Sequence, residues 1–244
     1  MEKNFNSLYF RFLRIKQLGW IKSMRKGPTG VGYTFEELLN KKEDHLPLPD
    51  YKGIEIKTMK CFSKHKIHLF NATPDNKGED TIKTLVNKLG YPDRTNPEFK
   101  VFNVSLNAKE YTKIGYKMIK IAVNHEKEKI ELKAYSTYGK NFDLNISWSF
   151  KMLEKCLKQK LENLAIVKVW SKEIDSEDYF YYSSISFYKL RDFQTFIKLI
   201  EEGIIEVQFK IGIHREEQNL GKTYDRGTDF SIKEENIPLL FEKI

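Results

Sequence analysis

Long apolar runs, cysteine and low-complexity stretches are what this sequence of 244 residues has least of. No run approaches the roughly 18 to 20 apolar residues of a membrane-spanning helix, so we expect no membrane partner. The first segment, MEKNFNSLYFRFLRIKQLGW, is interrupted by Arg11 and Arg14 and lacks the apolar block of a signal peptide. Its periodicity predicts an amphipathic helix that covers the core.

Cysteine occurs at only two positions, Cys61 and Cys156, which are far apart and match no metal-binding or redox spacing. This usage is typical of a reducing compartment, so we expect a cytoplasmic protein. No internal repeat and no linker divides the chain. Its length therefore fits one large domain with two lobes.

Positive charge is what the chain has in excess. The net charge is +8, yet 31% of the residues are charged with both signs and 40% are hydrophobic, which indicates a folded basic protein rather than a basic tail. A basic surface raises the local concentration of polyanions, so nucleic acid is the first candidate partner. A lysine-rich surface kept for solubility is the alternative.

Hydrophobic periodicity predicts alternating strands and helices, and hence an α/β protein with a mixed sheet. We expect strands over residues 51–59, from Ile67 as a neighbouring strand, from Phe99, Tyr116 and Lys129, and over 164–171, 178–188 and 204–213. We expect helices over residues 82–89, from Ser149, and over 193–200 before Gly203.

The stretch GPTGVGYT, residues 27–34, has the glycine spacing of a phosphate-binding loop. Tyr33 stands where that loop needs a lysine, and the lead-in KSMRK is not a buried strand, so a nucleotide hydrolase is disfavoured. We predict instead that the glycines turn the chain into a helix capped by Thr34. The amides of that helix or Lys26 are expected near a phosphate of a bound nucleic acid.

The strongest local pattern is PDYKGIEIK, residues 49–57. On an extended strand Glu55 and Lys57 point to one side, and Asp50 at the preceding bend folds back toward them. Two close carboxylates repel unless a cation lies between them, and their hard oxygens favour Mg²⁺. We therefore predict a solvent-facing pocket suited to metal-dependent phosphodiester hydrolysis, with Glu36 as a fourth group. An ordinary solvated strand face is the alternative.

Several segments together resemble the MvaI/BcnI-type restriction endonucleases: KGPTGVGYTFEELL, the PD-x4-E-x-K core with its IEIKT continuation, KIGIH and GKTYDRGTDF. That family is related to the nicking enzyme MutH and belongs to the PD-(D/E)xK nuclease superfamily. The likeness extends from about Gly19 to about Ile232.

The resemblance implies a PD-(D/E)xK restriction-endonuclease-like fold, with a central mixed β-sheet flanked by helices. It implies a two-lobed DNA clamp, with a catalytic lobe over residues 1–163 and a recognition lobe over residues 164–244. The activity implied is that of a type II restriction enzyme that cuts double-stranded DNA at a short pseudo-palindromic site. It would use one or two Mg²⁺ ions, act as a monomer on each strand in turn, and be accompanied by a cognate DNA methyltransferase.

Carried over by position, Asp50 and Glu55 are metal ligands, Lys57 is the catalytic lysine and Glu36 is the helix-borne acid. The residues expected to read DNA are Lys210, His214, Lys222, Thr223, Tyr224, Asp225 and Arg226. Relatives tend to carry histidines at the positions of Tyr224 and Arg226, so the target sequence does not transfer.

The basic residues at and after the end of the catalytic strand are expected to face DNA phosphates or simply solvent: Lys60, Lys64, His65, Lys66 and His68. A metal site at His65 and His68 is disfavoured because no third ligand is near in the sequence. The tryptophans, Trp20, Trp148 and Trp170, are expected to anchor cores.

Two alternatives stay open. A MutH-like repair nuclease that nicks one strand is the enzymatic one. A DNA-binding protein without catalysis is the other, and the intact set of two acids and a lysine argues against it. Carboxylates that face DNA phosphates reduce affinity unless a cation neutralises them.

Overall fold

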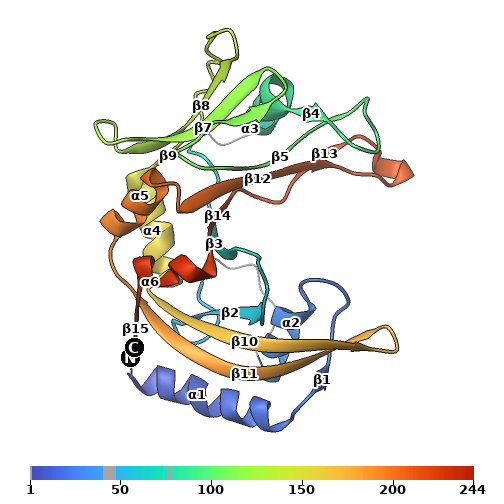
Figure 1. The fold of residues 1–244 in the computed structure, drawn as a ribbon, viewed down its shortest axis with the longest axis vertical. Helices are drawn as coiled ribbons and strands as arrows, with labels where there is room; N and C mark the ends of the chain where they lie inside the picture. The colour runs from blue at the N-terminus through green and yellow to red at the C-terminus, as the bar shows by residue number, and fades with distance from the viewer. Residues whose placement is uncertain (1, 41–47, 76–78) are drawn as a thin grey trace. The chain divides into compact units, whose positions relative to one another are not determined.

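The computed structural model describes residues 2–40, 48–75 and 79–244. These residues fold into two compact units, each assembled from separate stretches of the chain (Figure 1). Unit 1 comprises Met1–His65, Cys156–Arg191 and Ile237–Ile244, and unit 2 comprises Lys66–Lys155 and Asp192–Asn236. The boundary predicted near residue 163 does not coincide with a boundary between these units. The strand that begins at Asn163 pairs with residues 55–60 inside unit 1.

Unit 1 is built on a mixed sheet with the strand order β1-β11-β10-β2, and β15 pairs with β11. Strand β2 runs parallel to β10, and the other pairs are antiparallel. The strands are β1 (Ile21–Lys22), β2 (Glu55–Lys60), β10 (Asn163–Ile174), β11 (Glu177–Leu190) and β15 (Phe241–Lys243). The predicted mixed sheet is confirmed, and its last strand in this order carries the acid and lysine of interest.

The helices of unit 1 are α1 (Glu2–Gln17), α2 (Gly30–Leu38), α6 (Ile237–Leu240) and the second half of α4 (Phe150–Leu161). Helix α1 is the predicted amphipathic helix, with Leu8, Phe12 and Ile15 buried. These side chains share a core with Ile56 of β2 and Val167 of β10, and burying each contributes about 2 kcal/mol. Among the described residues, no helix is long and apolar enough to cross a membrane.

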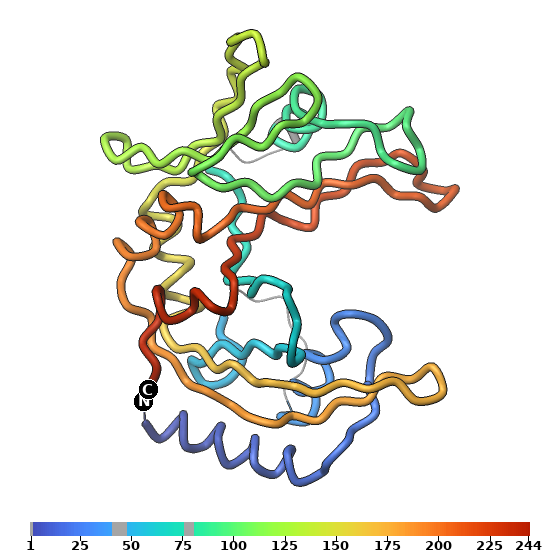
Figure 2. The backbone as a smooth tube through the Cα atoms, viewed as in Figure 1, coloured from blue at the N-terminus to red at the C-terminus, as the bar shows by residue number. Residues whose placement is uncertain are grey.

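Both ends of the chain close unit 1. The ring of Phe5 on α1 lies 5.2 Å from that of Phe187 on β11, and the amide of Ile244 donates to the carbonyl of Phe187 at 3.1 Å. Figure 2 shows the two ends side by side. Unit 1 therefore needs the first helix and the last strand as well as the segments between them.

Unit 2 contains two further sheets, ordered β3-β14-β12-β5-β4 with β13 on β12, and β6-β7-β8-β9. The strands of the first are β3 (Ile67–Asn71), β4 (Tyr91–Pro92), β5 (Lys100–Leu106), β12 (Ile205–Ile213), β13 (Thr223–Asp225) and β14 (Asp229–Ile232). Those of the second are β6 (Thr112–Ile114), β7 (Lys117–Asn124), β8 (Lys129–Ser136) and β9 (Ser147–Ser149). Its helices are α3 (Glu79–Thr84), continued by a π-helical turn over Leu85–Leu89, the first half of α4, and α5 (Phe193–Glu201). It also has 3-10 turns over Glu217–Asn219 and Glu234–Asn236.

Three expectations about these elements were wrong. The strand from Ile67 does not neighbour β2 but pairs with β14 in unit 2, because its apolar side chains complete that core. Trp20 and Trp170 do not anchor cores, since they are 43% and 44% exposed. Trp148 is the buried anchor that was expected, and its indole Nε1 donates to the carbonyl of Ala72 at 2.9 Å.

Candidate active site

The bend before β2 brings Asp50 back to the strand. Tyr51 and Ile54 close a two-residue turn by exchanging backbone hydrogen bonds of 2.8 and 2.9 Å. The two central residues have φ of 46° and 83°, as in a type I′ turn, and Gly53 adopts this conformation without steric cost. The turn directs the carboxylate of Asp50 onto β2, where its Oδ2 accepts from the amide of Ile56 at 2.9 Å.

Glu55 and Lys57 form the charged pair at the start of β2. The Nζ of Lys57 donates to Oε1 of Glu55 at 2.5 Å, and the Nζ of Lys160 on α4 lies 3.5 Å from the same oxygen. Glu55 is only 1% exposed, so the predicted solvent-facing pocket is wrong on this point. Within the part of the chain that the structure describes, Oε2 of Glu55 has no hydrogen-bond partner, which is costly for a buried carboxylate.

The surroundings of Glu55 act on its protonation in both directions. Burial raises the pKa of Glu55 above its ordinary 4.5, and the charge of Lys57 is the largest opposing effect. The charge of Asp50 raises the pKa further, while that of Lys160 lowers it. A cation bound here would strongly stabilise the ionised form of Glu55, because it offsets both the cost of burial and the repulsion from the second acid.

Two carboxylates are the protein ligands that these residues offer to an ion. In the described ranges no cluster of three or more His, Cys, Asp and Glu side chains is arranged to hold a metal. Mg²⁺ is commonly bound by one or two carboxylates and completes its coordination with water and phosphate oxygens. The unpartnered Oε2 of Glu55 is an acceptor that such an ion would satisfy. Asp50 and Glu55 therefore fit the predicted ion.

The glycine stretch enters α2 earlier than predicted. The helix begins at Gly30, and Thr34 is buried inside it with its hydroxyl accepting from the amide of Met24 at 3.0 Å. Thr34 is therefore not the cap. A Cβ on Gly30 would lie 2.4 Å from the carbonyl oxygen of Arg25, so the absent side chain is what lets the chain fold back so closely.

Glu36 lies on α2 in a pocket of about 350 Å³, lined also by Gly32 and Thr58. A Cβ built on Gly32 would lie 3.5 Å from Oγ1 of Thr58 and 3.9 Å from Oε1 of Glu36. Thr58 and Lys57 are consecutive on β2, so their side chains point to opposite sides of the strand. Glu36 thus approaches β2 from the side of Thr58, and its role as a fourth catalytic acid stays a prediction.

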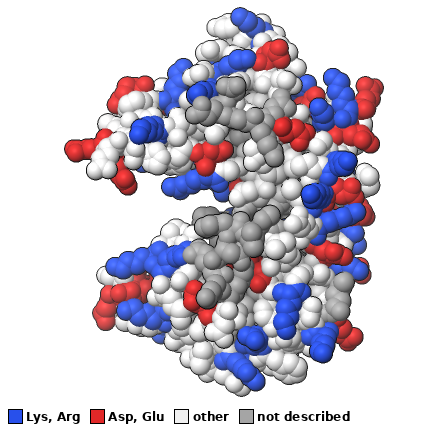
Figure 3. Space-filling model, turned by 180° about the vertical axis from the view of Figure 1, so that it is seen from behind, with Lys and Arg blue, Asp and Glu red and all other residues white. Residues whose placement is uncertain are grey.

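The other predicted basic residues of unit 1 lie at its surface. Lys26, Lys64 and His65 are exposed, whereas Lys60 is half-buried with its Nζ 5.4 Å from the ring centre of Phe180. Figure 3 shows Lys and Arg interspersed with Asp and Glu over the face in view. Contact with DNA phosphates stays a prediction for these residues.

In unit 2 part of the predicted reading set meets on one pocket of about 240 Å³. Its lining consists of Asn103, Gln208, Lys210, Gly212, Tyr224 and Arg226. The ring of Tyr224 lies over Gly212, since a Cβ there would be 2.7 Å from the phenol oxygen. The guanidinium of Arg226 lies 5.0 Å from the same ring and the imidazole of His214 5.1 Å from it.

The remaining predicted readers are oriented differently. The Nζ of Lys222 donates to Oδ1 of Asn219 at 2.9 Å, and Oδ1 of Asp225 accepts from the amide of Gly227 at 2.9 Å. Thr223 is exposed on β13. None of these three lines the pocket described above, so the seven predicted readers do not form one cluster.

Two buried acids of unit 2 were not predicted from the sequence. Asp229 is 2% exposed and pairs with Lys210 and, at 3.1 Å, with Nε2 of His68. Burial and the charge of Arg226 lower the pKa of Lys210. The only available signal was that Asp229 falls within the quoted segment GKTYDRGTDF.

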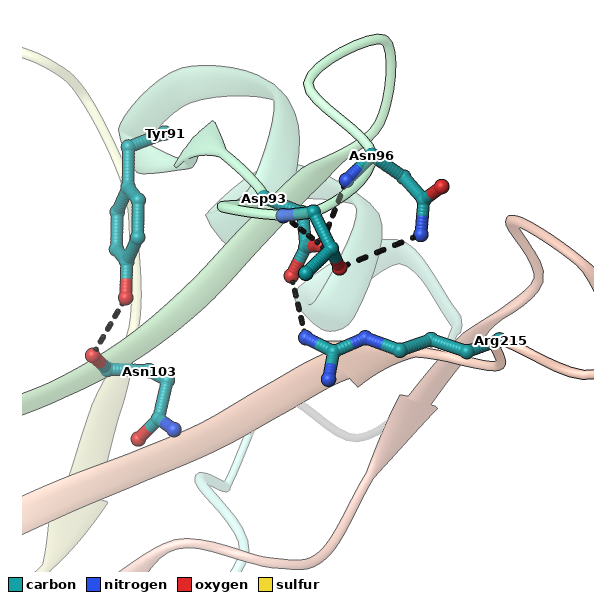
Figure 4. Close-up of polar contacts among 6 residues, drawn as sticks. Tyr91, Asp93, Asn96, Asn103 and Arg215 are labelled. Carbon is teal, nitrogen blue, oxygen red and sulfur yellow. Dashed lines mark hydrogen bonds and ion pairs between the residues drawn. The ribbon is translucent and has the colours of Figure 1, made fainter.

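Asp93 is the second of these acids (Figure 4). Its Oδ1 accepts from the hydroxyl and amide of Thr95 and from the amide of Asn96, and its Oδ2 accepts from Arg215 at 2.9 Å. The hydroxyl of Thr95, assisted by Arg215, holds the pKa of Asp93 well below its usual range despite burial. Because Arg215 follows His214, this cluster fixes the chain where it leaves β12.

Comparison with known proteins came to the same family as the sequence motifs. The model of the MvaI/BcnI restriction endonuclease family matches residues 10–241. A solved structure of restriction endonuclease MvaI in complex with cognate DNA is similar with a TM-score of 0.90 and 29% identity, covering 100% of this chain and 98% of that one. MvaI in the absence of DNA is similar with a TM-score of 0.63 and 28% identity, at the same coverage. Among curated proteins no match was found.

Proposed function

The chain belongs to the MvaI/BcnI restriction endonuclease family and is a type II site-specific deoxyribonuclease, and on that premise we propose that it cuts both strands of DNA in a Mg²⁺-dependent reaction. One observation carries the proposal. The buried carboxylate of Glu55 contacts Lys57 on its own strand, and the bend at Asp50 places a second carboxylate beside it.

Asp50 and Glu55 are the residues that would hold the ion. Bound there, Mg²⁺ supplies a Lewis acid that polarises the scissile phosphodiester and lowers the pKa of its bound water. Lys57 keeps a positive charge beside the carboxylates, orients the attacking water and stabilises negative charge that develops on the phosphate. Glu36 is proposed as the helix-borne acid that supports this set or binds a second ion.

We assign the PD-(D/E)xK fold to the chain, with catalysis in unit 1 and sequence reading in unit 2. The pocket around Lys210, Tyr224 and Arg226 supports the second assignment, because lysine and arginine pair with guanine in the major groove. The solved structure with the TM-score of 0.90 is a complex with DNA, which supports a double-stranded substrate. The proposed enzyme is a monomer that cuts the strands in turn, and a cognate methyltransferase protects the host DNA.

Digestion of a sequenced phage or plasmid DNA tests this function. With Mg²⁺ the purified protein should give discrete fragments, and sequencing their ends should give one short recurrent site. Lys57→Ala should abolish cleavage while binding to the same DNA persists. A matched control is Lys133→Ala, which removes a lysine from an equivalent glutamate-lysine pair on β8.

Two outcomes would overturn the proposal. Product with one strand intact, made only with hemimethylated DNA or a mismatch-repair partner, would indicate a MutH-like nicking enzyme. Intact DNA under all these conditions, together with binding that divalent ions do not change, would indicate a DNA-binding protein without catalysis.

A further inference from the structure

Four aromatic side chains form a row across the sheet of unit 1. Tyr181 on β11 and Trp170 on β10 are paired in register. At one end the ring of Trp20, just before β1, lies 5.9 Å from that of Tyr181. At the other end Phe62, just after β2, packs its ring edge-on at 5.3 Å from Trp170. The row therefore crosses the strands at one level of the sheet.

This row lies on the same face of the sheet as Glu55 and Lys57. Lys57 is in register with Ile166 on β10, and Trp170 follows Ile166 by four residues, an even number that keeps the side of the strand. The intervening bulge leaves the alternation on β10 intact, because Val167 and Val169 both enter the core on the other face. The aromatic row and the proposed catalytic residues thus lie on one face of the sheet of unit 1.

The row is exposed to an extent that packing does not explain. Phe62 is 87% exposed, and Trp20 and Trp170 retain nearly half of their surface. Phe62 also has a φ of 64°, a left-handed conformation that is unfavourable for a large aromatic residue. An exposed aromatic cluster with one member in a strained backbone conformation is typical of a contact surface rather than of a core.

The charge around the row suits a polyanion. Lys168 and Lys172 flank Trp170 at two residues on either side of it, on the same face of β10. The Nζ of Lys172 lies 4.4 Å from the ring centre of Trp20. Glu177, which is in register with Ile174, is an acid on this face, and it is paired with Lys22 at 3.3 Å. Aromatic rings interleaved with lysines are suited to the sugars and phosphates of DNA.

We propose that this aromatic row is a second DNA-contacting site, which seats the duplex beyond the scissile phosphate. At about 3.3 Å per residue along a strand, Trp170 lies about 13 Å from the level of Lys57. With a rise of about 3.4 Å per base pair along the axis of DNA, this distance corresponds to about four base pairs. The row then contacts sugar and phosphate groups of flanking DNA and extends the footprint past the recognised sequence. This inference rests on the proposed placement of catalysis at Lys57.

Flank-dependent binding tests the proposal. Affinity is measured by fluorescence anisotropy in a Lys57→Ala background, so that substrate stays intact. A long duplex extends about ten base pairs beyond the recognised sequence on each side, so that it includes the position four base pairs from the cut. A short duplex extends about one base pair on each side, so that it omits that position. The parent should bind the long duplex about tenfold more tightly than the short one.

Phe62→Asn and Trp170→Ala should each remove most of this difference and leave affinity for the short duplex unchanged. Asparagine removes the ring but accepts the left-handed backbone, so the variant keeps the local fold. Tyr138→Ala is the control, because Tyr138 is 91% exposed in unit 2 and lies outside the row. It should keep the full difference between the two duplexes.

In proteins with Lys57 intact, Phe62→Asn should cleave the short duplex at the parental rate. That result separates the two proposals. If the catalytic assignment is wrong, Lys57→Ala still cleaves DNA. If the proposed DNA-contacting site is wrong, the row variants keep the parental ratio of long-duplex to short-duplex affinity. An unchanged ratio of long to short affinity in both row variants overturns the inference. So does a parental dimer, detected by sedimentation, that Phe62→Asn dissociates, because the row would then bind a second copy of the chain.

Discussion

Two strands of this chain carry a glutamate followed two residues later by a lysine, one in each unit. On β2 the Nζ of Lys57 lies 2.5 Å from Glu55, and on β8 the Nζ of Lys133 lies 2.7 Å from Glu131. The side chains of Glu55 and Lys57 are 2% and 20% exposed, whereas those of Glu131 and Lys133 are 17% and 41% exposed. The same spacing thus forms a pair with a buried glutamate in unit 1 and a more exposed pair in unit 2.

The two glutamates respond to their surroundings in opposite directions. Burial raises the pKa of Glu55, while the hydrogen bond from Lys133 lowers that of Glu131. Glu55 also has a second acid beside it, Asp50, and Glu131 instead has Asn124 as a further donor. A glutamate-x-lysine strand therefore becomes suited to a cation where burial and a second carboxylate are added.

The largest expected effect comes from removing each glutamate charge in turn. Glu55→Gln should lower the single-turnover cleavage rate roughly a thousandfold, because the proposed Mg²⁺ ion would lose a ligand and the scissile phosphate would lose the stabilisation that the ion supplies. Glu131→Gln, the matched control, should stay within about twofold of the parent, as for most surface substitutions. Equal losses in both variants, or none in either, would remove the distinction between the two strands.

A smaller effect is expected from the helix that packs against β2. Gly30→Ala should cost about 1 to 3 kcal/mol of unfolding free energy, since its Cβ would meet the backbone of Arg25 at 2.4 Å. Gly32→Ala on the same helix should be neutral or stabilising by up to about 1 kcal/mol, because its nearest contact, with Thr58, is 3.5 Å. Urea unfolding measures both. Similar stabilities for the two variants would contradict the close packing at Gly30.

The smallest effect is the pH dependence of stability in the metal-free protein. A raised folded-state pKa means that Glu55 holds its proton more tightly when folded, so its contribution to stability falls as pH rises above the ordinary 4.5. Glu55→Gln removes this penalty. In the presence of EDTA the Tm of the variant should exceed that of the parent at pH 8, and the gain should disappear below about pH 4.5.

Glu131→Gln should behave in the opposite sense. A lowered folded-state pKa contributes stability above the ordinary value, and this contribution is lost as pH falls through the lowered one. The Tm of this variant should therefore be slightly below that of the parent at pH 8 and converge with it in acid. Parallel Tm profiles for both variants across this range would contradict the opposite pKa shifts.

Much of the fold was predictable, because the pattern of apolar residues is local. The helix from residue 2, the strands over residues 117–136 with their hairpin, and the buried edge of α4 at Leu153, Leu157 and Leu161 follow the expected periodicity. Helix starts and strand partners were less predictable. Thr34 is a residue type that commonly caps helices, but α2 begins at Gly30, so Thr34 lies inside the helix.

The candidate site shows the same division. The spacing of Asp50, Glu55 and Lys57 predicted their meeting, since a two-residue turn and the alternation of one strand suffice to bring them together. Lys160 was not predictable, because it reaches Glu55 from a helix distant in sequence. The pocket lined by Lys210 and Arg226 likewise joins Asn103 of β5 to Tyr224 of β13, a meeting that requires the register of a whole sheet.

The sequence by itself determined the order of elements, the acid-acid-lysine set on one strand and the bend before it, and the family to which the chain belongs. These depend on spacing along the backbone, which local geometry converts directly into side-chain direction. Only the tertiary structure decided that Glu55 is buried while Glu131 is partly exposed, and that Trp20 and Trp170 lie exposed rather than in a core. Burial depends on which distant segments pack over a residue, and identical local patterns on β2 and β8 carry no information about that.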